Sequence, residues 1–310
     1  MVGLIRLLGF IALNGRIALV VGLIAGLMLP GVAQILRPWL PQMIAGLLFL
    51  TAFRIGPKAA LGGLADGFQT LKVALAYQVG MPLLALAIFA AFGISTTPFA
   101  IAILLMLAAP PVTGSPNITI LLGHNPEPAF RILIIGTAIL PLTIIPVFWL
   151  SPALGDLSTT LAAAFRLLGA IGVAVAAAFV LRHLFAPTIS KPKTEALDGL
   201  MAIALAVIVI GLMSALGPAI NSNPTQVLKW LAVALIANLG LQYTAFRIMR
   251  FRGRDTVAVP FGVVAGNRNF ALFLIALPAA TTEPLLVFLG CYQVPMYLTA
   301  VLMRRIYNRA

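Results

Sequence analysis

Residues 98–123 read PFAIAILLMLAAPPVTGSPNITILLG, an apolar run interrupted at its centre by three prolines, a glycine and three polar side chains. A proline removes a backbone donor and clashes with the carbonyl four residues earlier, so we expect the helix to break here. In lipid, a freed backbone group is costly unless protein or a water-filled cavity receives it. The break therefore provides six candidate site residues: Pro110, Pro111, Thr113, Ser115, Pro116 and Asn117.

A second apolar run, residues 257–280, is interrupted by the sequence Gly266-Asn267-Arg268-Asn269. Arg268 lies near the centre of this run, where a charge costs about 2.5–3.5 kcal/mol on insertion scales and usually faces a cavity or a partner. Snorkelling to the membrane surface is the alternative, and the central position disfavours it. All four residues are candidate site residues.

Three further polar residues lie in apolar runs. Gln78 either belongs to the site or simply forms a hydrogen bond between helices, and the sequence leaves both interpretations open. Asn238 and Gln242 are one turn apart on one helix face, where interhelical hydrogen bonding is the favoured interpretation. We retain Gln78 and Asn238 as supporting residues of the site.

The composition predicts a membrane protein. Of the 310 residues, 62% are hydrophobic and only 9% are charged, whereas soluble domains average about 25% charged residues. A membrane-spanning helix needs about 20 apolar residues, and such runs follow one another along the chain. We therefore predict an all-α integral membrane protein with about ten transmembrane helices: Ile17–Leu36, Pro41–Ile55, Val73–Phe92, Pro98–Gly123, Ile132–Leu150, Leu161–Leu181, Gly199–Ile220, Val227–Phe246, Val257–Ala280 and Leu285–Met303.

The net charge of +13 is distributed between alternate gaps of these spans. Most Lys and Arg residues fall before the first span or after even-numbered spans, and the other side holds little more than Arg37, Arg166 and Lys229. This is the positive-inside pattern, and it places both termini in the cytoplasm. We therefore expect a multi-pass protein of the inner (plasma) membrane, with the lipid bilayer as its partner and no nucleic acid.

The polar stretch Ser151–Thr160 divides the chain into two halves of five spans each, residues 1–153 and 154–310. Because five is odd, the second half must enter the membrane from the opposite side. Two five-helix halves of this kind would form an inverted repeat, an architecture common among transporters. In each half the fourth span is the interrupted one, so helices 4 and 9 are the predicted broken helices.

Three regions of the chain resemble the bile acid:sodium symporter family. Residues 54–57, Arg-Ile-Gly-Pro, are similar to the short polar loop after its second helix, and Gln78 before Met81-Pro82 is similar to its third-helix glutamine. Residues 110–124 resemble its proline- and glycine-rich fourth helix, and residues 262–272 resemble its ninth. The resemblance extends over most of the chain at low similarity.

This resemblance implies two structural units. A core domain would comprise residues from about 69–150 and 225–310, and a panel would comprise residues from about 1–56 and 157–216. Broken helices 4 and 9 would cross near the membrane midplane with the substrate at the crossing, and rocking of the core against the panel would give alternating access.

The chain departs from the family at the expected sodium ligands. Val264 stands where a glutamate would help to hold sodium, and Arg268 stands at the position of the helix 9 glutamine. Pro116 replaces the serine of the helix 4 Ser-Asn pair, although Asn117 is retained; two hydroxyl ligands are replaced by Phe130 and Ile134. Because a guanidinium has only donors and repels a cation, the sodium sites look largely dismantled.

We therefore predict a secondary transporter of a small organic anion, with no cofactor, in which Arg268 replaces a bound cation as a fixed charge. Arg268 could brace the crossing by donating to carbonyls freed at Pro110–Asn117, and could attract the anion. A sodium-coupled symporter of the same family, a channel and a structural membrane protein are the alternatives. The sequence leaves the substrate, and the choice between monomer and homodimer, open.

An enzyme is not expected. All seven acids lie at predicted span ends or in loops, and no pair suits intramembrane proteolysis or magnesium-dependent prenyl transfer: Asp66, Glu127, Asp156, Glu195, Asp198, Asp255 and Glu283. The same distribution leaves no mid-membrane carboxylate relay for protons. Facilitated diffusion or exchange is therefore an option for the transport mode.

Overall fold

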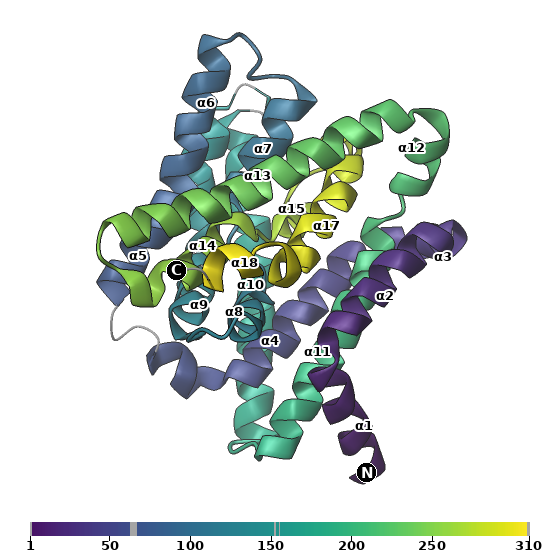
Figure 1. The fold of residues 1–310 in the computed structure, drawn as a ribbon, viewed down its shortest axis with the longest axis vertical. Helices are drawn as coiled ribbons and strands as arrows, with labels where there is room; N and C mark the ends of the chain where they lie inside the picture. Colours follow the sequence, from purple (N-terminus) through teal and green to yellow (C-terminus); the bar gives the residue numbers. More distant parts are fainter. Residues whose placement is uncertain (1, 63–66, 152, 155, 309–310) are drawn as a thin grey trace.

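The computed structural model describes residues 2–62, 67–151, 153–154 and 156–308, and every regular element among them is helical (Figure 1). Asp66 and Arg309 lie outside the described residues. In chain order the elements are α1 (Val2–Leu13), α2 (Gly15–Met28), α3 (Pro30–Leu36), η1 (Arg37–Trp39), α4 (Leu40–Gly62), α5 (Gly67–Leu75), η2 (Ala76–Gly80), α6 (Met81–Ala91), α7 (Pro98–Ala108), α8 (Ser115–Leu121), α9 (Glu127–Trp149), α10 (Leu157–Phe185), α11 (Lys191–Leu212), α12 (Leu216–Ser222), α13 (Pro224–Phe251), α14 (Asp255–Gly266), η3 (Phe270–Leu272), α15 (Phe273–Ala276), α16 (Ala279–Thr282), η4 (Glu283–Leu285), α17 (Leu286–Leu302) and α18 (Arg304–Asn308).

Within the described part of the chain, seven helical segments are long and apolar enough to cross a membrane: Pro30–Pro57, Gly67–Ala91, Glu127–Trp149, Leu157–Phe185, Lys191–Ser222, Pro224–Phe251 and Ala279–Asn308. The bent pair Gly3–Leu13 and Ile17–Met28 supplies an eighth if it counts as one span. These helices support the predicted multi-pass membrane protein. Pro98–Ala108 and Asp255–Gly266 are shorter apolar helices, and they belong to the two predicted interrupted spans.

The start of the chain differs from the prediction. Ile17–Leu36 was expected as one span, but α2 ends at Met28 and Pro30 opens α3 in its first turn. Pro30 cannot donate a backbone hydrogen bond, so the helix stops before it and a new one starts, where the missing N–H costs nothing. A further helix, α1, precedes the first predicted span and was not predicted.

The segment Arg54-Ile55-Gly56-Pro57, expected as a loop, is a kink inside α4. Gly56 has a φ of 74°, a left-handed conformation that side chains with a Cβ rarely adopt. The Arg182 guanidinium, from the end of α10, donates to the carbonyls of Phe53 and Arg54. The backbone groups released by the kink are therefore satisfied by a neighbouring helix.

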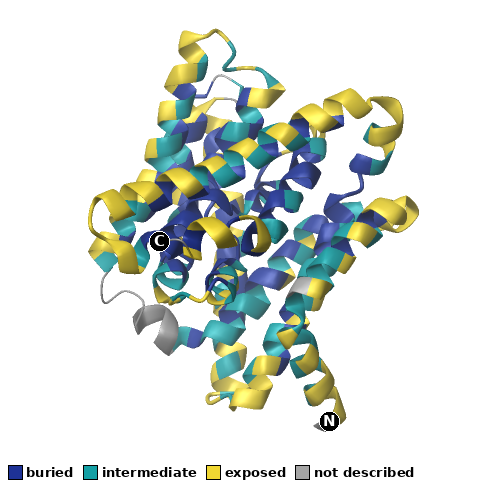
Figure 2. Ribbon diagram, viewed as in Figure 1, coloured by how far each residue is buried: buried dark blue, intermediate teal, exposed yellow. Residues whose placement is uncertain are grey.

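Helices α11 and α4 each contact several neighbours, as do α13 and α9, and α10 packs against both α4 and α9. Helix α11 contacts α1, α2, α3 and α4, and α4 also contacts α10. Helix α13 contacts α14 and α17, and α9 contacts α5, α8 and α14. Figure 2 shows buried residues at the centre of the molecule and exposed residues along the outer helices. The inverted repeat and the division into core and panel remain predictions.

Large apolar side chains cover much of the outer surface, including those of Phe10, Phe165, Phe185 and Ile236. A soluble monomer rarely exposes contiguous apolar area on this scale. Lipid tails are as apolar as these side chains, so a bilayer accounts for their exposure.

Gly22 sets how closely α2 approaches α11, because a Cβ added there would lie 2.8 Å from the Ala206 carbonyl oxygen. We expect Gly22→Ala to cost about 1–3 kcal/mol through overpacking, measured as a lower melting temperature in detergent. Gly172→Ala in α10 is the matched control, since no atom lies within 4 Å of its added Cβ. Equal melting temperatures for the two variants would contradict this close approach.

Candidate functional site

The two interrupted segments meet each other. The amide of Val112 donates to the Asn267 carbonyl at 2.9 Å, and the amide of Asn269 donates to the Pro110 carbonyl at 2.7 Å. Between these bonds, Pro111 faces Arg268 in an antiparallel bridge. Each break therefore supplies partners for backbone groups that the other has freed, which is what a low-dielectric surrounding requires.

The two breaks have different local causes. In the first, Pro110 and Pro111 lack backbone donors, and the preceding residue, Ala109, is extended. The second contains no proline between Gly266 and Asn269. There Asn267 leaves the helical conformation for an extended one, and its side chain and its amide both donate to the Val263 carbonyl, at 2.9 Å and 3.0 Å.

Arg268 holds the crossing from inside. Its side chain is only 1% exposed, and it donates from Nε to the Ala265 carbonyl at 2.8 Å and from Nη1 to the Ala109 carbonyl at 3.1 Å. The guanidinium carbon lies 4.9 Å from the centre of the Tyr77 ring, a cation–π arrangement. The acceptor at Ala109 lies one residue before the predicted range Pro110–Asn117.

This positive charge has no carboxylate partner among the described residues: the ion pairs found there join Arg37 with Glu283, Arg54 with Asp198, Arg131 with Glu127 and Arg250 with Asp255. A buried ion without a counter-charge is expensive. Carbonyl dipoles and the face of Tyr77 offset part of this cost. Arg268 therefore places at the crossing a positive charge that no carboxylate of the described residues neutralises.

Asn238 of α13 braces the second break. Its Nδ2 donates to the Gly266 carbonyl at 2.6 Å and to Asn267 Oδ1 at 3.2 Å. A Cβ added at Gly266 would overlap the Asn238 carbonyl oxygen, so only glycine allows this approach. These contacts agree with the interpretation of Asn238 as an interhelical hydrogen bonder that supports the break.

A chain of hydrogen bonds continues from Asn238 toward the C-terminus. Gln242 Nε2 donates to Asn238 Oδ1 at 2.6 Å and to Thr299 Oγ1 at 3.0 Å. The Tyr307 hydroxyl of α18 donates to Gln242 Oε1 at 3.1 Å. Thr299 and Tyr307 were not predicted as site residues; the signal in the sequence was a hydroxyl within an apolar span and a phenol just after it.

Tyr292 is another residue of the site that was not predicted. Its hydroxyl donates to the Gly266 carbonyl and accepts from the Arg268 amide at 3.1 Å. Tyr292 therefore provides a donor for the last carbonyl of α14 and an acceptor for an amide just after the helix ends. The signal in the sequence was a tyrosine in the middle of the last apolar run.

Gln78 lies on a π-helical turn, η2, between α5 and α6, a feature frequent at functional sites. Its side chain is buried and binds only α9 among the described contacts: Nε2 donates to the Gly136 carbonyl at 3.1 Å, and Oε1 accepts from Thr143 Oγ1 at 3.4 Å. This geometry favours the interhelical interpretation. The same turn places Tyr77 against Arg268.

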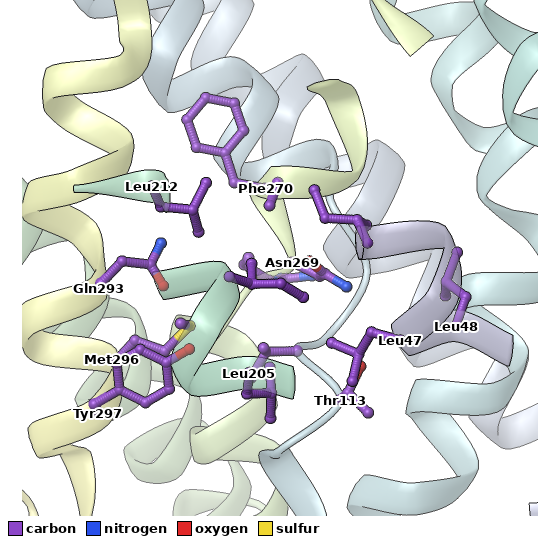
Figure 3. Close-up of a pocket in the computed structure, with 15 residues that line it drawn as sticks. Leu47, Leu48, Thr113, Leu205, Leu212, Asn269, Phe270, Gln293, Met296 and Tyr297 are labelled. Carbon is purple, nitrogen blue, oxygen red and sulfur yellow. The ribbon is translucent and has the colours of Figure 1, made fainter. Parts of the chain in front are cut away.

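A small cavity of about 30 Å³ lies at the crossing, which is room for about one or two water molecules. Figure 3 shows Asn269 near the middle of the lining residues, with Gln293 and Met296 of α17 on one side and Leu47 of α4 on the other. Its polar lining includes Thr113, Asn269, Gln293 and Tyr297. The cavity is therefore bounded by both breaks and by helices α4, α11 and α17.

A larger cavity of about 340 Å³ adjoins it. The two cavities share Val112, Thr113, Leu205, Met296 and Tyr297. The larger one extends along α1, α2 and α11 and is also lined by Gly114, Asn117, Glu195 and Asp198. Asp198 is paired with Arg54 at 2.9 Å.

The predicted first-break residues are thus divided. Thr113 and Asn117 line cavities, whereas the Ser115 side chain is fully buried, with no hydrogen-bond partner for its hydroxyl in the described part of the chain. Pro110 and Pro111 contribute backbone to the crossing, and Pro116 lies in the first turn of α8.

No protein-family model matches the chain, and no curated protein sequence matches it. Within the described residues, no group of three or more His, Cys, Asp or Glu side chains could hold a metal ion.

We expect Asn238→Leu to destabilise the protein by about 1–3 kcal/mol, because it removes the buried hydrogen bonds of the Asn238 side chain to the Gly266 carbonyl and Asn267 Oδ1 and leaves Gln242 Nε2 without one of its acceptors. The measurement is the melting temperature in detergent. Asn117→Leu is the control, since Asn117 is exposed on the wall of the larger cavity. The role of Asn238 would be refuted if both variants melted together with the parent.

Proposed function

We propose that this chain is a secondary membrane transporter whose substrate site lies at the crossing of the two breaks. The main support for this proposal is that non-helical backbone from two segments far apart in the sequence meets in the buried interior, beside a cavity. Lipid does not tolerate such backbone unless it is buried in protein or lines a cavity. Transporters commonly place their substrates at discontinuous helices of this kind.

The larger cavity supports this proposal by providing a route to the crossing. It runs from the start of α11, where Glu195 and Asp198 lie, to Thr113 and Asn117 at the first break. Its volume of about 340 Å³ lies in the range of small-molecule sites, about 300–1,000 Å³. The positive-inside pattern assigns this mouth to the cytoplasm, in the inner (plasma) membrane.

We further propose that Arg268 takes the place of a bound cation. Its donors occupy the carbonyls of Ala109 and Ala265, and Val264, two positions from the end of α14, offers no side-chain oxygen. A cation placed among these groups would meet a fixed positive charge instead of oxygen ligands. Transport is then independent of sodium.

The same charge supports a small organic anion as the substrate. Arg268 lines the small cavity, and its guanidinium is buried and donates to backbone carbonyls, so its positive field acts on an anion in the cavity. In a low-dielectric interior that field is weakly screened. A carboxylate next to Thr113 and Asn269 is therefore the favoured substrate group.

Sodium independence is tested by reconstituted uptake. A library of small radiolabelled carboxylates is presented to proteoliposomes in sodium buffer and in choline buffer. We expect the transported compound to enter equally fast in both and to show saturation and counterflow. A strong sodium requirement would refute the substitution by Arg268, and flux without saturation would indicate a channel.

The anion is tested by thermal shift. A carboxylate present at a concentration of about 100 times its Kd should stabilise the parent protein by about 2.7 kcal/mol. The variant Arg268→Gln should lose this stabilisation because it lacks the positive charge. Arg247→Gln, at the far end of α13, is the control variant and should keep it. An uncharged amide analogue should stabilise neither; equal stabilisation of the parent and Arg268→Gln would exclude a role for this charge.

A further inference from the structure

The two ends of the molecule differ in how closely the predicted panel and core approach each other. The larger cavity is lined by the end of α1, the start of α2 and the first part of α11 on one side and by α8 and α17 on the other. Figure 1 places the N-terminus of α1 at the bottom of the view and α3 and α12 higher, along its right edge. At the end of the molecule that holds the segment Ala276–Glu283, α10 and α4 of the predicted panel contact α15 of the predicted core directly.

Arg37 makes a charged contact at this closed end. It lies in η1, between α3 and α4, and its Nη2 is 2.9 Å from Oε1 of Glu283 in η4, just before α17. The partners are 246 residues apart in sequence. Arg37 belongs to the predicted panel and Glu283 to the predicted core, so the ion pair joins the two units.

Arg166 makes a second contact of the same kind. It lies on α10, in the predicted panel, and its Nη1 donates at 3.3 Å to the carbonyl of Ala276, the last residue of α15. A cation at the end of a helix meets carbonyls that have no intrahelical partner. Two panel arginines therefore hold one short core segment, Ala276–Glu283, which connects the second break to α17.

The charge pattern of the sequence adds an independent observation. Arg37 and Arg166 are two of the few cations on the side that the positive-inside rule assigns to the outside. In the described residues both are engaged across the predicted panel–core boundary, whereas cations on the other side, such as Arg54 and Arg131, pair within one unit. The two arginines on the predicted outer side therefore both link the predicted panel to the predicted core.

We propose that Arg37 and Arg166, with Glu283 and the Ala276 carbonyl, form an outer gate that holds this face closed while the cavity is open to the cytoplasm. The proposal rests on the proposed transport function and adds a conformational element to it. Opening the outer face requires the panel to leave the segment Ala276–Glu283, which breaks both contacts. The exposed ion pair contributes modestly, so the gate can open during a transport cycle.

Cysteine accessibility tests the gate without knowledge of the substrate. Cys291, the single cysteine, is replaced by alanine, and Thr113→Cys provides a reporter on the cavity wall. A charged, membrane-impermeant maleimide is applied to spheroplasts for the outer face and to inverted vesicles for the cytoplasmic face. We expect labelling mainly from the cytoplasmic face.

In this background Arg37→Glu should raise the rate of labelling from the outer face about two- to fivefold, because the loss of an exposed ion pair shifts a conformational equilibrium by about that factor. Arg37→Glu combined with Glu283→Arg should restore the slow rate. Arg250→Glu is the matched control: Arg250 pairs with Asp255 at 3.0 Å with similar exposure, but both residues lie in the predicted core. It should leave the outer-face rate unchanged.

Arg166→Gln provides a second measurement if Arg37→Glu does not fold, and it should raise outer-face labelling in the same direction. The gate is overturned if the reporter labels from the cytoplasmic face and neither variant raises the outer-face rate, or if the charge swap does not restore it. Those results leave the transport proposal standing. A reporter that labels from neither face in any variant overturns the cavity itself, and with it both proposals.

Discussion

The need to satisfy backbone groups away from water determines the centre of this molecule. Two helices stop in the interior, and the amides and carbonyls they release find partners in each other at Val112–Asn267 and Pro110–Asn269. Arg268 adds donors for two further carbonyls. The surrounding helices supply Asn238 and Tyr292 to the same region. The two breaks, Arg268, Asn238 and Tyr292 thus form one connected hydrogen-bond network.

The general class of fold was predictable because hydropathy alone separates lipid-facing helices from loops. The long helices lie close to the predicted runs. Boundaries were less predictable where a proline does not end a span but starts the next helix, as at Pro30. The kink at Gly56 was also not predicted, because the Arg182 guanidinium that satisfies its backbone carbonyls is distant in the sequence. Such tertiary compensation is invisible to a local pattern.

The candidate site was predictable where the sequence itself is unfavourable for a helix in lipid. Prolines 110 and 111 and a central arginine signal a break without any knowledge of what surrounds them. The partners were not predictable, because Tyr77, Tyr292 and Thr299 are ordinary residues of membrane helices. Their importance comes from distances such as the 4.9 Å between Arg268 and the Tyr77 ring. Ser115 shows the converse, since a polar residue in the broken segment is buried away from the cavities.

The crossing also has a consequence for how the protein is made. Arg268 and its acceptor Ala109 are 159 residues apart, which at about 5–20 residues per second is about 8–32 seconds of synthesis. During that interval the first break is already in the membrane and its partner does not yet exist. Water, the insertion machinery or neighbouring nascent helices must then satisfy the free carbonyls. Because Arg268 is synthesised after the first half has been inserted, the first half can complete its fold only once the second half is made.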